Sequence, residues 1–199
     1  MAIRSFCLAL TLLVAAPALA QDVKGVILDE PSQLGDFQLT DHRGEPFTLE
    51  DLVGQWSLVF LGFTHCPDVC PFTLANLEAV RSQLSMLVPP ERLPQIVFLA
   101  VDPARDRPVL ADYVAHFDLS FIGITGEPGE IARLAHGLDA YYRLEKKSDD
   151  DDAYDVVHSA AVAVVNPAGA VKAKITPPFH PQGTANYLHL LLRGMEGIN

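Results

Sequence analysis

The chain has 199 residues, of which 25 are acidic and 14 are basic, so its formal net charge is -11 at pH 7. This excess of negative charge opposes binding to phosphate backbones, and we exclude nucleic acids as partners. After the first 20 residues, no apolar run approaches the roughly 20 residues that a membrane-spanning helix needs, so we expect a soluble body.

The N-terminus has the layout of an export signal. Arg4 precedes an apolar run from Phe6 to Ala16, and Ala18-Leu19-Ala20 fits an A-x-A cleavage site. We expect cleavage after Ala20 and a periplasmic protein, whereas an uncleaved signal would tether the chain to the inner membrane. Cys7 lies inside the apolar run and leaves with the signal, so the mature chain keeps two cysteines.

Removal of the signal leaves 179 residues, which fits one domain. The predicted organisation is a signal peptide at 1–20, an N-terminal extension at 21–33 and a single domain at 34–199. This domain has no internal repeat and no inter-domain linker.

Strands and helices alternate along the predicted domain. A turn at Asp41-His42-Arg43-Gly44 predicts a hairpin over 37–49. The apolar run 56–63 predicts a strand buried on both faces, and apolar residues at helical spacing predict a helix over 72–88. The remaining predictions are a strand at 96–101, a helix that Asp106 caps and that continues to 117, a strand at 121–124, a helix over 131–138, a strand at 141–144, a solvated acidic loop at 145–155, a hairpin of strands at 160–165 and 170–175, and a terminal helix that includes 188–195. This order predicts an α/β fold.

Two cysteines four residues apart stand at the predicted start of the first long helix. Residues at this spacing share one helix face, and the amides and dipole of a helix start stabilise thiolates. Two thiolates at Cys66 and Cys70 suit Cu(I) and zinc better than magnesium or calcium. A disulfide is the alternative in an exported chain. Because it would close a very small loop, such a bridge would add little stability and is better explained by redox or metal chemistry.

The segment around these cysteines resembles the signature of the Sco/SenC family. It reads Phe60-Leu61-Gly62-Phe63-Thr64-His65-Cys66-Pro67-Asp68-Val69-Cys70-Pro71, and residues 101–106 and 121–123 resemble two further blocks of the family. The likeness runs from about Phe37 to the C-terminal helix. It implies a thioredoxin-like fold with a central mixed β-sheet flanked by helices. It also implies a Cu(I) site of two cysteines, here Cys66 and Cys70, and one distant histidine, used in assembling the copper centre of cytochrome c oxidase.

Seven histidines compete for the third ligand position. We favour His158, because residues 154–159 resemble the histidine block of the family and precede a predicted strand. His65 is awkwardly placed beside Cys66, and His180 lies in a loop before the last helix. The other four lie in a predicted turn or in predicted helices: His42, His116, His136 and His189. An imidazole facing two thiolates would make a three-coordinate metal site.

The leading hypothesis is a metallochaperone without enzymatic turnover that carries Cu(I), with binding of Cu(II) left open. The expected partners are a copper-accepting oxidase subunit, a thioredoxin-like periplasmic reductase that keeps the cysteines reduced, and another copper chaperone. The runner-up is a thiol-disulfide oxidoreductase that reduces the cysteines of a copper-site partner through a redox-active Cys66–Cys70 disulfide. Zinc competes as the metal, although structural zinc sites normally have four protein ligands. A peroxide-reducing thiol enzyme ranks last.

Overall fold

The computed structural model describes residues 23–146 and 154–194. The signal peptide predicted at 1–20 and the centre of the predicted acidic loop, 147–153, lie outside the described residues. Within the described ranges, none of the helices combines the length and the apolar character needed to cross a membrane.

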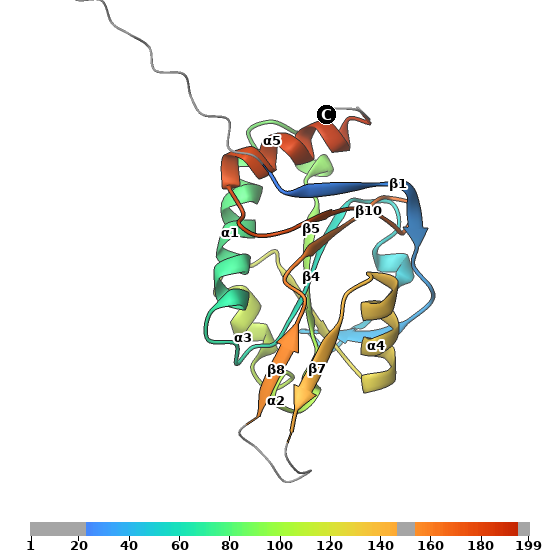
Figure 1. The fold of residues 1–199 in the computed structure, drawn as a ribbon, viewed down its shortest axis with the longest axis vertical. Coiled ribbons are helices and arrows are strands. Elements are labelled where there is room, and N and C mark those ends of the chain that lie inside the picture. The colour runs from blue at the N-terminus through green and yellow to red at the C-terminus, as the bar shows by residue number, and fades with distance from the viewer. Residues whose placement is uncertain (1–22, 147–153, 195–199) are drawn as a thin grey trace, which may run out of the picture.

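A mixed sheet of eight strands forms the centre of the fold (Figure 1). Its spatial order is β1-β10-β9-β4-β5-β6-β2-β3, with β4 to β6 parallel and the other neighbours antiparallel. The strands are β1 (Gly25–Gln33), β2 (Gln38–Asp41), β3 (Pro46–Thr48), β4 (Ser57–Gly62), β5 (Gln95–Ala100), β6 (Ile122–Thr125), β9 (Val162–Val165) and β10 (Ala170–Ile175). Every residue of β4 is buried, as expected for a strand with both faces covered.

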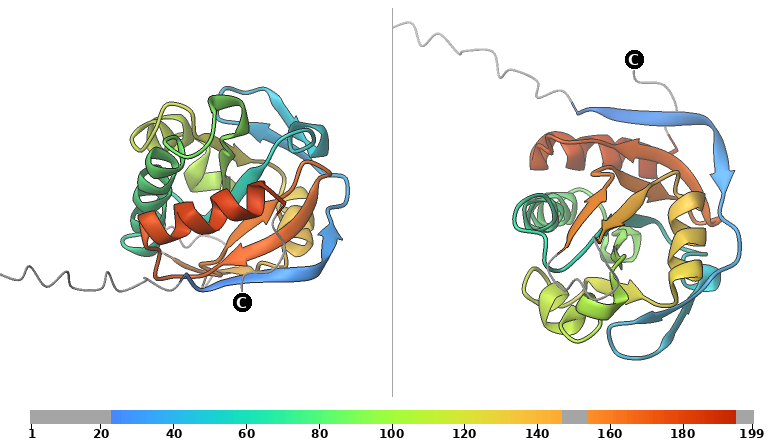
Figure 2. Two further views of the ribbon diagram at one scale, coloured as in Figure 1. Left: turned by 90° about the horizontal axis from the view of Figure 1, so that it is seen from above. Right: turned by 60° about the horizontal axis from the view of Figure 1, so that its bottom comes forward.

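Helices cover both faces of this sheet, with α1 and α3 on one side and α4 on the other (Figures 1 and 2). Helix α5 packs against α1. The helices are α1 (Val69–Leu84), α2 (Pro103–Asp106), α3 (Leu110–Ala115), α4 (Pro128–Gly137) and α5 (Pro181–Leu192), with 3-10 turns at Leu49–Asp51 and Pro90–Arg92. The α/β fold predicted from the sequence is therefore confirmed.

The strands β7 (Tyr142–Glu145) and β8 (Asp155–His158) form a separate two-stranded antiparallel sheet. Tyr142 lies opposite His158 at one end of this ribbon, and Glu145 lies opposite Asp155 at the other. The sequence predicted β7 but placed residues 155–158 at the edge of a loop and before a strand. His158 is instead the last residue of β8.

Two further predictions differ from the structure. The segment 21–33, predicted as an extension outside the domain, contains β1, which pairs with β10 at the edge of the central sheet. Nearly all of β1 is exposed, so it lacks the alternating apolar pattern that identifies a half-buried strand. The helix predicted to follow an Asp106 cap begins only at Leu110, as α3, and Asp106 is instead the last residue of the short helix α2. Asp106 turns inward, and Pro108 between the two helices has no amide hydrogen to continue a helix.

Candidate metal centre

The pairing of β4 with β9 brings two distant parts of the chain together. These strands are antiparallel, with Phe60 opposite Val162. Residues that follow β4 therefore lie beside residues that precede β9, although the two segments are far apart in sequence. The first group includes Cys66 and the second includes His158, so the strand order itself assembles the candidate site.

Three donor atoms meet at this place. The sulfur atoms of Cys66 and Cys70 and a ring nitrogen of His158 all lie within 4.8 Å of one another. The Sγ of Cys70 is 3.3 Å from Nε2 of His158, and both cysteines are free thiols. With metal–sulfur and metal–nitrogen bonds of about 2.3 and 2.0 Å, trigonal ligand atoms stand roughly 4 Å apart. One metal ion could therefore bind all three atoms after small adjustments.

The two cysteines differ in exposure. Cys66 precedes α1 and is half-buried, whereas Cys70 is the second residue of α1 and is fully buried. The backbone amide of Cys70 donates a hydrogen bond to Sγ of Cys66 over 3.3 Å. The pair thus has one sulfur that faces the opening of the site and one that is fixed in the core.

The thiol of Cys70 does not follow the sequence-based expectation of a stabilised thiolate. Burial raises its pKa well above the usual value, and this effect exceeds the lowering by the hydrogen bond with the Phe63 backbone. A metal ion that binds Cys70 must displace the thiol proton.

His158 is oriented by a carbonyl group and two aromatic rings. Its Nδ1 lies 3.0 Å from the backbone oxygen of Ser159, which can only accept, so Nδ1 carries the proton and Nε2 presents its lone pair to Cys70. The rings of Phe60 and Phe63 stand edge to face with the imidazole, at centroid distances of 6.1 and 5.9 Å. Burial lowers the pKa of His158, which favours the neutral form that binds metals.

The loop after β5 holds the segment that leads to Cys66. Asp106 is fully buried, and its carboxylate accepts hydrogen bonds of 2.7 Å from both the amide and the hydroxyl of Thr64. It also accepts a hydrogen bond of 2.9 Å from the amide of Asp102. The sequence suggested that Asp106 caps a helix. That prediction is wrong, because the carboxylate is directed at the loop before Cys66.

The same loop holds the start of β8. Asp102 occupies the N-cap position of α2, but its side chain makes no capping hydrogen bond. Its carboxylate instead forms an ion pair with Arg105 and accepts a 2.8 Å hydrogen bond from the hydroxyl of Tyr154. The guanidinium of Arg105 lies 3.7 Å from the ring centroid of Tyr154, close enough for a cation–π interaction. The loop therefore fixes both the cysteine segment and the strand that ends at His158.

The other histidines lie outside this cluster. His65 is exposed, with Nδ1 3.0 Å from the Thr64 hydroxyl, and His180 is the N-cap residue of α5. His42 accepts a hydrogen bond from the amide of Gly123. Among the described residues, the metal-type cluster of histidines, cysteines and acidic residues contains Cys66, Cys70 and His158 alone.

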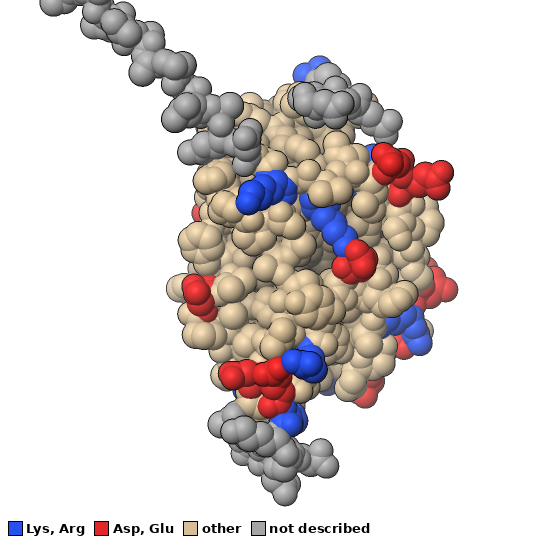
Figure 3. All heavy atoms as spheres, in the orientation of Figure 1, with Lys and Arg blue, Asp and Glu red and all other residues tan. Residues whose placement is uncertain are grey.

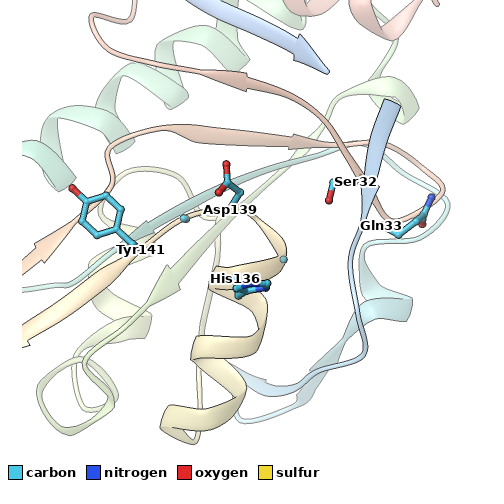
Figure 4. Close-up of a pocket in the computed structure, with 7 residues that line it drawn as sticks. Ser32, Gln33, His136, Asp139 and Tyr141 are labelled. Carbon is cyan, nitrogen blue, oxygen red and sulfur yellow. The ribbon is translucent and has the colours of Figure 1, made fainter. Parts of the chain in front are cut away.

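The surface around the site carries few charges. Figure 3 views the face formed by α1, β7 and β8, where the Lys, Arg, Asp and Glu side chains lie mostly around a largely uncharged centre. A separate hollow of about 430 Å³ is lined by Ser32, Gln33, His136, Gly137, Asp139, Ala140 and Tyr141. Its labelled side chains point in different directions (Figure 4), and none of the three candidate ligands lines it.

Gly62 provides the space that Cys70 occupies. A Cβ at this position would lie 2.6 Å from Sγ of Cys70 and 2.9 Å from Cε2 of Phe98. We expect Gly62→Ala to lower the free energy of unfolding by about 1–3 kcal/mol, because such overpacking displaces core side chains. Urea unfolding of the reduced protein measures this change. Gly35→Ala is the control, since its Cβ would contact nothing within 4 Å, and equal stability of the two variants would contradict the steric argument.

Because His158 and Cys70 are buried, we expect the free energy of unfolding of the reduced, copper-free protein to be highest between about pH 6.5 and pH 9 and to fall on either side. Below about pH 6.5, unfolded His158 binds a proton that the folded protein resists, so stability falls with decreasing pH. Above about pH 9, unfolded Cys70 releases a proton that the folded protein retains, so stability falls with increasing pH. Each limb is limited to about 1.4 kcal/mol per pH unit.

Urea unfolding over this pH range measures both limbs. His158→Ala should flatten the acidic limb, while His116→Ala, which removes an exposed histidine, should leave it unchanged. An acidic limb that persists fully in His158→Ala would show that other groups cause it.

Comparison with known proteins agrees with the fold. The SCO1/SenC family model matches residues 28–193. The chain is 43% identical over 138 residues to the mitochondrial SCO2 homolog of Homo sapiens. This match covers 68% of this chain and 50% of that protein. It is 33% identical over 199 residues to a protein of Stutzerimonas stutzeri that is described as copper-binding. This match covers 96% of this chain and 95% of the relative. The chain thus spans about half the length of the mammalian SCO2 homologues that it matches.

Solved structures of the same kind confirm the thioredoxin-like fold. Arabidopsis thaliana ScoI with copper bound is 31% identical, has a TM-score of 0.71 and covers 80% of this chain and 98% of its own. Yeast Sco1 with copper bound is 27% identical, has a TM-score of 0.74 and covers 84% of this chain and 91% of its own. The family match spans all three residues that carry the donor atoms. This chain therefore belongs to the SCO1/SenC family.

Proposed function

We propose that this protein is a copper chaperone that binds Cu(I) through Cys66, Cys70 and His158 and delivers it to the copper centre of cytochrome c oxidase. The observation that supports this proposal is the meeting of two free sulfurs and one imidazole nitrogen within 4.8 Å. Thiolates are soft ligands that select Cu(I), and an imidazole suits copper as well. Copper-binding relatives with matching folds support the choice of metal.

The three ligands have different parts in capture and release. Cys66 is half-buried and can be reached by a donor or acceptor protein, while Cys70 holds the ion from the core. His158 presents a neutral nitrogen that needs no deprotonation. Three protein ligands leave room for an incoming thiolate or imidazole, so the ion can pass to an acceptor by ligand exchange.

The proposed cellular setting follows from the N-terminal sequence and the chemistry of the thiols. Residues 1–20 direct export to the periplasm, or tether the protein to the inner membrane if they are retained. In that oxidising compartment Cys66 and Cys70 form a redox-active disulfide, so a thioredoxin-like reductase must act before loading. The other proposed partners are a copper-accepting oxidase subunit and a second copper chaperone that supplies the ion.

A thiol-disulfide oxidoreductase is the second candidate, because one thiol of the reduced pair is half-exposed and the other lies directly behind it. In this reading Cys66 attacks the disulfide of a copper-site partner, and Cys70 resolves the mixed disulfide. Two protein thiols become a disulfide, and the partner disulfide becomes two thiols. This chemistry does not require His158 as a ligand.

Anaerobic titration of the reduced protein with Cu(I) tests the proposed function. We expect one tightly bound ion per chain, thiolate-to-copper absorption in the ultraviolet, and X-ray absorption that reports two sulfur ligands and one nitrogen ligand. A parallel titration with Zn²⁺ should give weaker binding. A protein that binds no Cu(I) but rapidly reduces protein disulfides would replace the chaperone with the oxidoreductase, and a preference for Zn²⁺ would overturn the choice of metal.

A further inference from the structure

One short segment, residues 102–106, contacts both parts of the chain that supply the candidate ligands. Asp106, the last residue of α2, binds the amide and the hydroxyl of Thr64, two residues before the first ligand cysteine. Asp102, the N-cap residue of the same helix, accepts a hydrogen bond from the hydroxyl of Tyr154, four residues before His158. The segment therefore joins the loop that leads to the sulfurs with the strand that leads to the imidazole.

Tyr154 is held to this segment by three contacts. Its hydroxyl lies 2.8 Å from both carboxylate oxygens of Asp102, which is also ion-paired with Arg105. The guanidinium of Arg105 lies 3.7 Å from the ring centroid of Tyr154, and its Nη1 donates a 3.1 Å hydrogen bond to the Tyr154 backbone oxygen. Tyr154 and Asp102 are both buried, so water competes little for the hydrogen bond between them. A hydrogen bond to a carboxylate in such a place is among the stronger ones in a protein.

The direction of β8 links this contact to the candidate ligand. Successive side chains of a strand point to opposite faces, so Tyr154, Val156 and His158 point the same way. Burial agrees with this alternation. Tyr154 and Val156 are buried and His158 is half-buried, whereas Asp155 and Val157 between them are exposed. Tyr154 and His158 thus stand at the two ends of one inward-facing row, about 13 Å apart along the strand.

The strand partner of β8 is β7, and the two form a sheet separate from the central one. The place of β8 against the core is therefore set by its inward-facing side chains, and not by pairing with β4 or β9. Within that row, Tyr154 supplies the hydrogen bond to a buried carboxylate. The distance between the imidazole of His158 and the sulfurs thus depends on a contact at the other end of the strand.

We propose that Tyr154, held by Asp102, is a positioning residue for Cu(I) binding that keeps the imidazole of His158 within reach of the two sulfurs. The inference rests on the proposed Cu(I) site and adds a residue that does not touch the ion. With the hydrogen bond in place, β8 stays in the arrangement that brings the three donor atoms together. Without it, fewer molecules have that arrangement, and the apparent affinity for the metal falls by the same fraction.

Tyr154→Phe tests this role with little change of shape. The substitution removes the hydroxyl but keeps an aromatic ring against Arg105, and the carboxylate of Asp102 keeps its ion pair. We expect the Cu(I) affinity, measured by anaerobic chelator competition, to fall by about 10-fold, because a hydrogen bond to a charged group contributes enough free energy for a change of that size. Amide hydrogen exchange of β8 in the copper-free, reduced protein should become faster.

Tyr142→Phe is the matched control on the same ribbon. Tyr142 lies opposite His158 on β7, and its hydroxyl is 3.5 Å from the backbone oxygen of Pro128, with no carboxylate as its partner. Loss of this hydroxyl should leave the Cu(I) affinity and the exchange of β8 unchanged within about twofold.

A double-mutant cycle distinguishes positioning from a general effect on the fold. In His158→Ala the ligand that β8 carries is absent, so the place of the strand no longer affects the metal. Adding Tyr154→Phe to His158→Ala should therefore lower the remaining Cu(I) affinity by less than about twofold. A residue that only supports the fold would lower the affinity by the same factor in both backgrounds.

The outcomes separate this inference from the proposed function. Unchanged Cu(I) affinity or unchanged exchange of β8 in Tyr154→Phe would overturn the inference and leave the proposed function in place. An equal loss of affinity in Tyr142→Phe would do the same, as would an equal effect of Tyr154→Phe with and without His158. If the unmodified protein binds no Cu(I), the proposed function and the inference fall together.

Discussion

Cys66→Ser should lower the Cu(I) affinity by more than about 100-fold, beyond the 10-fold to 100-fold cost of changing a group outside the ligand shell. A serine hydroxyl is a hard and neutral donor, which suits Cu(I) poorly in comparison with a thiolate. Cys66 is half-buried and lies before α1, so the smaller oxygen should be accommodated without loss of the fold. Competition with a Cu(I) chelator under anaerobic conditions measures the affinity, and thermal unfolding verifies the fold.

The adjacent residue supplies the control for this prediction. His65→Ala removes an exposed imidazole one position away and should change the affinity by less than about threefold, as surface substitutions usually do. Cys66→Ser should also abolish thiol-disulfide exchange, because no disulfide with Cys70 can form. Copper binding that survives in Cys66→Ser would remove this cysteine from the ligand set.

His158→Ala should separate the two candidate functions. We expect the Cu(I) affinity to fall by more than about 100-fold, because the loss of a ligand exceeds a change outside the ligand shell. The rate of disulfide exchange should change by only a fewfold, since both sulfurs remain. The measurements are chelator competition for copper and the initial rate of reduction of a model protein disulfide by the reduced variant.

His180→Ala is the matched control, because His180 is the loop histidine that the sequence also offered as a third ligand. It should bind Cu(I) as the unmodified protein does. If His158→Ala keeps the affinity and the absorption spectrum, the ligand assignment of His158 is incorrect. If it loses disulfide exchange as strongly as copper binding, the two functions cannot be distinguished by this residue and the chaperone proposal loses its main support.

Local sequence patterns predicted most of the sheet and the placement of the cysteines. The apolar run before Cys66 became β4 and Cys70 lies in the first turn of α1, as expected, whereas Cys66 lies three residues before the helix. Gly44 takes a positive φ of 89° in the turn between β2 and β3, inside the predicted hairpin. These features depend on neighbours in the chain, which is why a single sequence is sufficient for them.

The position of His158 depended on the family resemblance. Its contact with Cys70 spans 88 residues and requires β9 to pair with β4 in the antiparallel direction. No periodicity in the sequence specifies which strands become neighbours. The short β8 escaped prediction for a related reason, since four residues beside a highly charged segment give too little pattern to identify a strand.

The supporting residues were the least predictable part of the site. Asp106 was interpreted as a helix cap, because Asp before a helical pattern commonly has that role. The carboxylate of Asp106 instead accepts a hydrogen bond from Thr64, and that of Asp102 binds Tyr154 and Arg105.

The detachment of β7 and β8 from the central sheet divides the candidate ligands between a rigid and a weakly supported part of the molecule. Two-stranded ribbons are marginally stable by themselves, and this one relies on contacts such as those of Tyr154 with Asp102 and Arg105. By contrast, Cys70 is buried in the first turn of the long helix α1, and Cys66 lies only three residues before that helix. Fraying of the ribbon would withdraw the imidazole and leave a two-coordinate ion on the sulfurs, an intermediate from which an acceptor could take the cargo without any unfolding of the core.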